Sequence, residues 1–198
     1  MIKPMIYALS LSMLLAAPAM AQVVVDYRDS AVLDMADTLQ WSGIAEQIGG
    51  GVEVLGEVRG SFVAAGSDDV AYLVSDGAPA AAEPFPELNQ RLVLFSDDQQ
   101  VADLPIDDSA FARPVTAVDL DGDGIDEIVL EGSFYNMGTL GIGLSVARVG
   151  DVAEIVQTLP DVYVDSCDAG VGEQSILASA VSVSDGQLVA EAETLDCP

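Results

Sequence analysis

The segment Asp119–Leu130 reads DLDGDGIDEIVL, and it decides how the rest of the chain is interpreted. It ends in EIVL, and the residues before it, PVTAVDL (Pro114–Leu120), are also rich in valine, leucine and threonine. Such runs, bounded by glycine, proline and aspartate, are typical of β-strands. From the end of the first run to the start of the second, Asp119 to Glu127, five acidic residues fall within nine positions. The segment therefore predicts an acidic loop that joins two strands of a mainly β protein.

The spacing of the acidic residues predicts a bound cation. Two like charges about 5 Å apart repel by roughly 3 kcal/mol at an effective dielectric constant near 20, unless the side chains spread into water or share an ion. Carboxylates at alternate positions converge when the backbone curls, and glycine permits the curl because it accepts positive φ. Oxygen ligands of this kind suit Ca²⁺. We expect the ligands to be the side chains of Asp119, Asp121, Asp123 and Glu127 and the carbonyl of Ile125.

The loop has two alternative interpretations. An EF-hand needs a bidentate glutamate at position 12 and helices on both sides, whereas position 12 here is Leu130 and the flanking segments are strand-like. The simpler alternative is an acidic hairpin turn that is only solvated. The agreement of three alternating aspartates, two glycines and an acid at position 9 favours calcium.

DLDGDGIDEIVL resembles the calcium loop of FG-GAP/VCBS-type repeats, which occur in the β-propeller of integrin alpha subunits and in many secreted bacterial proteins. The resemblance implies that the loop joins strands of a propeller blade, that the ion rigidifies it, and that the five residues named above are the ligands. A full propeller of that family has about seven blades, more than this chain can supply. An incomplete propeller, a small β-sheet domain and assembly from several chains remain open.

The expected fold class is mainly β, with antiparallel sheets that resemble the blades of a partial or small propeller. A short N-terminal helix, or else an edge element, is expected after Asp29–Ser30. Gly60–Val74 aligns with Val118–Gly132 at an offset of 58 positions, which predicts blade-like repeats near 60–117 and 118–166; chance similarity is the alternative. The expected strands are Asp69–Ser75, Arg91–Phe95, Pro114–Leu120, Glu127–Leu130, Leu140–Val149 and Asp151–Leu159, with a final hairpin of 179–184 and 187–193 around Asp185-Gly186.

The first 21 residues predict export. Lys3 precedes an apolar run from Met5 to Ala17, and Ala19-Met20-Ala21 offers the small residues of a cleavage site. The run is too short to span a bilayer comfortably. Residues 22–198 are thus expected to form a single secreted or periplasmic domain, with no membrane span once the signal is removed. Cys167 and Cys197 are expected to form a disulfide that closes the C-terminal hairpin region, since two free thiols would need a reducing compartment.

The chain has 33 acidic residues, six basic residues and no histidine. Loss of Lys3 with the signal leaves five arginines and a formal charge of −28 (five minus 33). Such a surface repels nucleic acid and attracts cations or basic proteins. The absence of histidine excludes histidine triads and histidine-ligated metal sites. We expect a non-enzymatic calcium-binding domain that meets a protein or glycan outside the cytoplasm. The alternatives are a carboxylate-dependent glycan hydrolase and a periplasmic inhibitor or binder of basic proteins.

Overall fold

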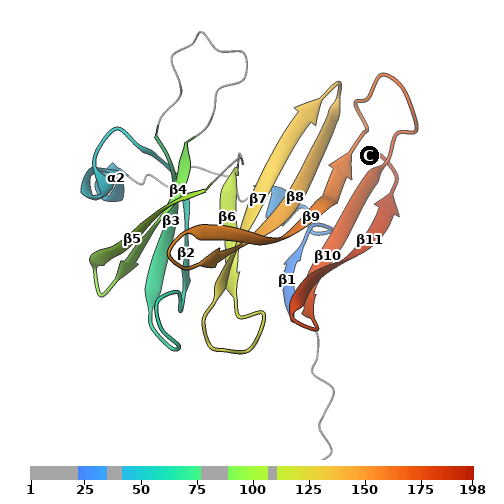
Figure 1. Cartoon of the computed structure of the whole chain (residues 1–198). Helices are drawn as coiled ribbons and strands as arrows, with labels where there is room; N and C mark the ends of the chain where they lie inside the picture. The colour runs from blue at the N-terminus through green and yellow to red at the C-terminus, as the bar shows by residue number, and fades with distance from the viewer. Residues whose placement is uncertain (1–21, 35–41, 77–88, 107–110) are drawn as a thin grey trace, which may run out of the picture.

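The computed structural model describes residues 22–34, 42–76, 89–106 and 111–198, and it is mainly β (Figure 1). The two short helices are α1 (Ala31–Asp34) and α2 (Ser42–Ile48). The strands are β1 (Val23–Asp26), β2 (Glu53–Gly60), β3 (Asp69–Ser75), β4 (Gln90–Ser96), β5 (Gln99–Ile106), β6 (Arg113–Val118), β7 (Glu127–Asn136), β8 (Thr139–Val149), β9 (Ala153–Asp165), β10 (Ile176–Ser184) and β11 (Gln187–Leu195).

The strands form two antiparallel sheets. One has four strands in the order β2-β3-β4-β5. The other has seven, in the order β1-β10-β9-β8-β7-β6, and β11 pairs with β10 outside this path. The prediction of a mainly β fold with antiparallel sheets is confirmed. In both sheets four strands that are consecutive in sequence, β2–β5 and β6–β9, also lie side by side in order.

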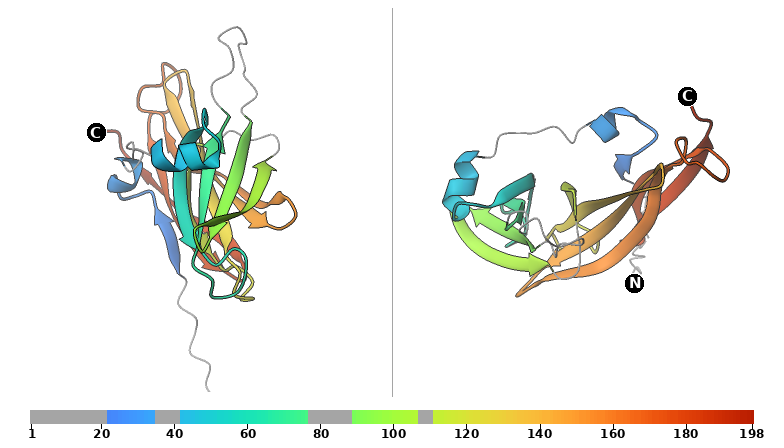
Figure 2. Two further views of the ribbon diagram at one scale, coloured as in Figure 1. Left: turned by 90° about the vertical axis from the view of Figure 1, so that its left-hand side faces the viewer. Right: turned by 90° about the horizontal axis from the view of Figure 1, so that it is seen from above.

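Three groups of buried side chains hold the sheets together. One joins the two sheets and includes Leu73 and Leu92 from the smaller sheet and Ile128 and Leu130 from β7. Another is formed by the larger sheet, including Val25 of β1, with Val32 and Leu33 of α1 packed against it, and a small one packs α2 against the smaller sheet. Seen from above, α2 lies at one end of the molecule, beside the smaller sheet, whereas α1 lies apart from it, on the side of the larger sheet (Figure 2). Because β4 and the first half of β7 are buried almost throughout, the acidic loop that precedes β7 is attached to a rigid strand.

The strands with the clearest sequence pattern were predicted correctly. β3 has the predicted bounds, and the β10–β11 hairpin turns at Asp185-Gly186, both with positive φ. Cys167 and Cys197 form the predicted disulfide. The N-terminal helix is present as α1, and the Asp29 carboxylate accepts a hydrogen bond from the Ala31 amide at its start.

Other elements were not predicted, namely α2, β1, β2 and β5. The predicted signal at residues 1–21, the end of the predicted helix near Leu39 and the segment 77–88 lie outside the described residues. Among the helices that the structure does describe, none has the length and apolar character that crossing a membrane requires.

Candidate metal centre

The acidic loop occupies residues 119–126 and connects β6 to β7. The structure brings together three of the predicted ligands, because one carboxylate oxygen from each of Asp119, Asp121 and Asp123 lies within 4.8 Å of the others. Asp119 is half-buried, and the other two aspartates are exposed. This group can hold a metal ion, and its oxygen atoms suit a hard cation.

The backbone of the loop is curled around its own aspartates. Asp119 accepts hydrogen bonds from the amides of Gly122 (2.8 Å) and Gly124 (2.9 Å), one on each carboxylate oxygen. Both glycines have positive φ, 78° and 86°, which a residue with a side chain adopts only at a cost. Oδ1 of Asp121 accepts a hydrogen bond from the Asp123 amide, and Oδ1 of Asp123 accepts one from the Ile125 amide. The curl predicted from the glycines therefore fixes the direction of all three carboxylates.

Glu127, the predicted ligand at position 9, lies beneath the loop and outside the group of three aspartates. Its side chain is only 5% exposed. One carboxylate oxygen accepts a hydrogen bond from the Leu120 amide (3.1 Å), and the other accepts from Arg148 Nε (2.9 Å). Ile125 is in the same turn, and its amide donates to Asp123. Glu127 thus ties the two ends of the loop together.

Arg148, on β8, is a residue of the site that the sequence did not reveal. Its Nη2 lies 2.8 Å from Glu127 and 3.4 Å from Asp121. The hydrogen bond to Glu127, followed by the charges of Glu127, Asp121 and Asp123, raises the pKa of the Arg148 guanidinium above its ordinary value. Arg148 therefore already offsets part of the negative charge of the loop.

The loop between β2 and β3, residues 61–68, has the same length and a related construction. Asp69, at the start of β3, accepts a hydrogen bond from the amide of Phe62 (2.9 Å), as Glu127 accepts one from the amide of Leu120. Gly66 has a φ of 77° and corresponds to Gly124. Both pairs of residues are related by the offset of 58 positions seen in the sequence. The first loop has neutral residues where the second has its three aspartates.

The first loop has a buried carboxylate of its own in Asp69. Burial alone would raise the pKa of Asp69, but hydrogen bonds from Ser67, Ser96 and the amides of Val63 and Phe62 outweigh it and lower this pKa below its ordinary value. The carboxylate is thus fixed in its charged form by donors from its own loop and by Ser96 at the end of β4. It has no lysine or arginine partner among the described ion pairs.

The two loops are in direct contact. The Ser61 amide donates to an Asp126 carboxylate oxygen (2.7 Å), and the Asp126 amide donates to the Ser61 carbonyl (2.9 Å). A Cβ on Gly124 would lie 2.8 Å from the Cβ of Ala65. Asp126, which the sequence did not place among the ligands, serves to join the loops. The acidic loop is consequently supported from the side as well as from below.

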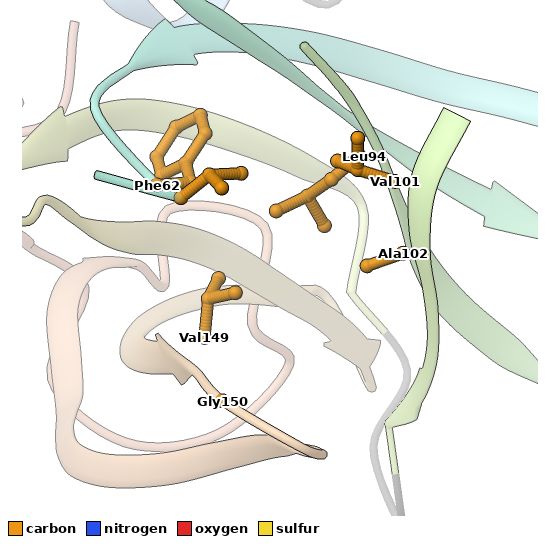
Figure 3. Close-up of a pocket in the computed structure, with 7 residues that line it drawn as sticks. Phe62, Leu94, Val101, Ala102, Val149 and Gly150 are labelled. Atoms are coloured by element: carbon orange, nitrogen blue, oxygen red, sulfur yellow. The ribbon is translucent and has the colours of Figure 1, made fainter. Parts of the chain in front are cut away.

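A pocket of about 270 Å³, lined by apolar side chains, lies next to the first loop (Figure 3). Two of its lining residues directly follow residues that contact the acidic loop: Val149 follows Arg148, and Phe62 follows Ser61. None of the lining residues is ionisable. They are Phe62, Val63, Leu94, Val101, Ala102, Val149 and Gly150.

Comparisons of the chain with protein-family models, with curated proteins and with solved structures give no significant match. The resemblance to FG-GAP/VCBS repeats therefore rests on the residues of the acidic loop. The geometry establishes a β-rich protein with a disulfide and a group of three aspartates that can hold a metal ion. The disulfide fits a non-reducing environment.

Proposed function

We propose that this protein is an exported β-domain that binds Ca²⁺ through the loop 119–126 and has a non-enzymatic role in binding a partner. The observation that carries the proposal is the convergence of three carboxylate oxygens within 4.8 Å, held by amides of the loop itself. The FG-GAP/VCBS resemblance supports the same ion and the same ligands. The ion would stabilise the loop and, through Ser61 and Asp126, the neighbouring hairpin.

Calcium suits this loop better than magnesium. Magnesium demands near-ideal octahedral geometry and keeps several waters, whereas calcium accepts six to eight oxygens in a flexible arrangement. The three aspartates supply the first oxygens, and the Ile125 carbonyl and Glu127 are the proposed additional ligands. Glu127 would then exchange its ion pair with Arg148 for a bond to the metal. Affinity near 10⁻⁴–10⁻³ M is typical of extracellular modules.

Titration calorimetry tests this proposal directly. We expect calcium to release or absorb heat on binding to the wild-type protein, and we expect the heat to vanish in the variant Asp121→Asn/Asp123→Asn. The matched control is Asp97→Asn/Asp98→Asn, which removes the same charge from the β4–β5 turn and should retain binding. Absence of binding by the wild-type protein at millimolar calcium, or equal binding by both variants, would rule out this site.

A second candidate function, the binding of basic proteins, is favoured by the distribution of charge. All five arginines after the predicted signal have an acidic partner in the chain: Arg28 with Asp26, Arg59 with Asp68, Arg91 with Asp76 and Asp103, Arg113 with Glu131, and Arg148 with Asp121 and Glu127. Most of the 33 acids have no such partner among the described ion pairs, so the outward field is negative and attracts cationic partners. A pull-down with a cationic enzyme tests this role, and binding lost by about 0.15 M salt would mean non-specific attraction only. The third possibility, a glycan hydrolase, needs paired carboxylates at its site. The pocket in Figure 3 is lined by apolar residues and gives that function no support.

A further inference from the structure

The tip of the β7–β8 hairpin exposes a group of large apolar side chains. Phe134 is 55% exposed, Tyr135 70% and Met137 85%. Val171, in the neighbouring loop 166–175, is 86% exposed. Both segments lie at the same end of the molecule (Figure 1). Phe134 and Tyr135 are consecutive in β7, so their side chains point to opposite faces of the hairpin, and its tip is apolar on both sides. We call these four residues the tip patch. Aromatic residues and methionine are enriched where proteins meet partners.

Met137 occupies a backbone conformation that its side chain disfavours. It has a φ of 50° and forms, with Gly138, the two-residue turn between the paired residues Asn136 and Thr139. Turns of this kind favour asparagine, aspartate or glycine. The other described non-glycine residues with positive φ are all aspartates: Asp97, Asp98, Asp161 and Asp185. An exposed methionine at such a position contributes nothing to the core, and strain of this kind is often retained at functional sites.

The tip is held in place by close contacts. The ring of Phe134 covers Gly141, its partner across the β7–β8 pair, so closely that the ring would have to move if a Cβ were added there. Gly138 approaches the backbone of Asp168 equally closely. Asp168 follows Cys167, which the disulfide links to Cys197. A rigid apolar surface loses little conformational entropy when a partner binds.

The surroundings of the tip patch are acidic. Residues 149–198 contain no lysine or arginine, and the end of β9 and the loop beside the tip contribute Asp165, Asp168 and Glu173. We infer that the tip patch is a docking surface for a cationic protein segment with an apolar face, in which apolar contacts provide affinity and the acidic surroundings provide attraction. This inference deepens the proposed partner-binding role and does not depend on the calcium site.

Charge also argues against two other occupants. A second copy of the chain would bring two strongly negative surfaces together, which costs free energy. An anionic membrane would be repelled in the same way. A basic segment with apolar residues can pack its apolar side chains on the tip patch while its positive charges face the acidic surroundings.

The test uses a synthetic amphipathic helix of lysine and leucine as the probe, with oligolysine of equal charge as its control. In about 0.15 M salt, we expect the amphipathic peptide to bind the wild-type protein at least about tenfold more tightly than the variant Met137→Asn, a hot-spot loss. Oligolysine should bind both proteins equally and weakly. Met137→Asn should also raise the melting temperature, because asparagine tolerates positive φ. A weaker-binding variant that is more stable cannot be explained by misfolding.

Several results would overturn the inference. The amphipathic peptide could bind both proteins equally or neither of them. Flotation of the wild-type protein, but not the variant, with neutral phosphatidylcholine vesicles would make the patch a membrane contact instead. A dimer in sedimentation that Met137→Asn dissociates would make it a self-association surface. Each measurement can be made in chelator, so failure of the calcium site would not affect the result.

Discussion

Removing two charges from the acidic loop should stabilise the calcium-free protein and abolish its response to calcium. The three carboxylates of the loop have oxygens within 4.8 Å of one another. At that distance each pair of charges repels by about 0.9 kcal/mol in water and about 3.5 kcal/mol at an effective dielectric constant of 20. Because Asp121 and Asp123 are exposed, the lower figure applies, and the three pairs together cost about 3 kcal/mol.

The variant Asp121→Asn/Asp123→Asn removes all three repulsions. Asparagine retains the side-chain oxygen that accepts the amides of Asp123 and Ile125, so the curl of the loop can persist. The exposed contact of Arg148 with Asp121, at 3.4 Å, is lost, at a cost of up to about 1 kcal/mol. The net gain of about 2 kcal/mol should raise the melting temperature in chelator by about 4–8 °C for a domain of this size.

Calcium should stabilise the wild-type protein but not the variant Asp121→Asn/Asp123→Asn, so it should reverse their order of stability or reduce the difference between them. With a dissociation constant of about 10⁻⁴–10⁻³ M, roughly 10 mM calcium stabilises the wild-type protein by about 1.4–2.7 kcal/mol, or about 3–10 °C. The assay is differential scanning calorimetry in chelator and in calcium, with Asp97→Asn/Asp98→Asn as the control that keeps the calcium response. A wild-type melting temperature that is the same in both conditions, with a variant no more stable in chelator, would refute the reasoning.

Three other perturbations probe the fold around the site. Tyr27→Phe removes the buried hydrogen bond that Tyr27 donates to Glu131 (2.6 Å), so urea unfolding should show a loss of about 1.5–3 kcal/mol. Burial, with Glu131 nearby, raises the pKa of Tyr27 above its ordinary 10.0. The stability that Tyr27 contributes is therefore fully present below about pH 10 and is lost at higher pH. In a pH series of melts, Tyr27→Phe should weaken this alkaline loss of stability. Replacing Cys167 and Cys197 by serine opens a span of 30 residues and should cost about 3.7 kcal/mol in urea unfolding if loop entropy dominates. Gly124→Ala adds a methyl group against the neighbouring loop at a φ of 86°, which should cost about 2 kcal/mol in urea unfolding and weaken calcium binding in calorimetry.

The strands that could be predicted from the sequence are those with a continuous apolar or alternating pattern. β3 reads DVAYLVS between polar turns, and the β10–β11 hairpin contains Asp-Gly, so local preference and burial agree. β2 and β5 were missed because they lie at the edges of their sheet and contain residues that are unfavourable in strands. Gly56 interrupts β2, while β5 begins with two glutamines and contains Pro105.

The site was predicted as far as local spacing allows. The three aspartates of the loop converge because the glycines three and five residues after Asp119 let the chain turn back upon its carboxylate. The contacts of Arg148 and Asp126 could not be predicted, because their partners are 21 and 65 residues away and only the pairing of strands brings them together. Met137 was not recognised either, since Met-Gly is not a typical hairpin turn.

The contact between the two hairpin loops explains why only one of them carries aspartates. Ala65 packs against Gly124, and Ser61 exchanges two hydrogen bonds with Asp126. A second triad at positions 61, 63 and 65 would place six carboxylates on either side of one narrow boundary, and the loops would be driven apart. In a pair of hairpins that touch in this way, the neutrality of one partner is the physical condition under which the other can concentrate negative charge.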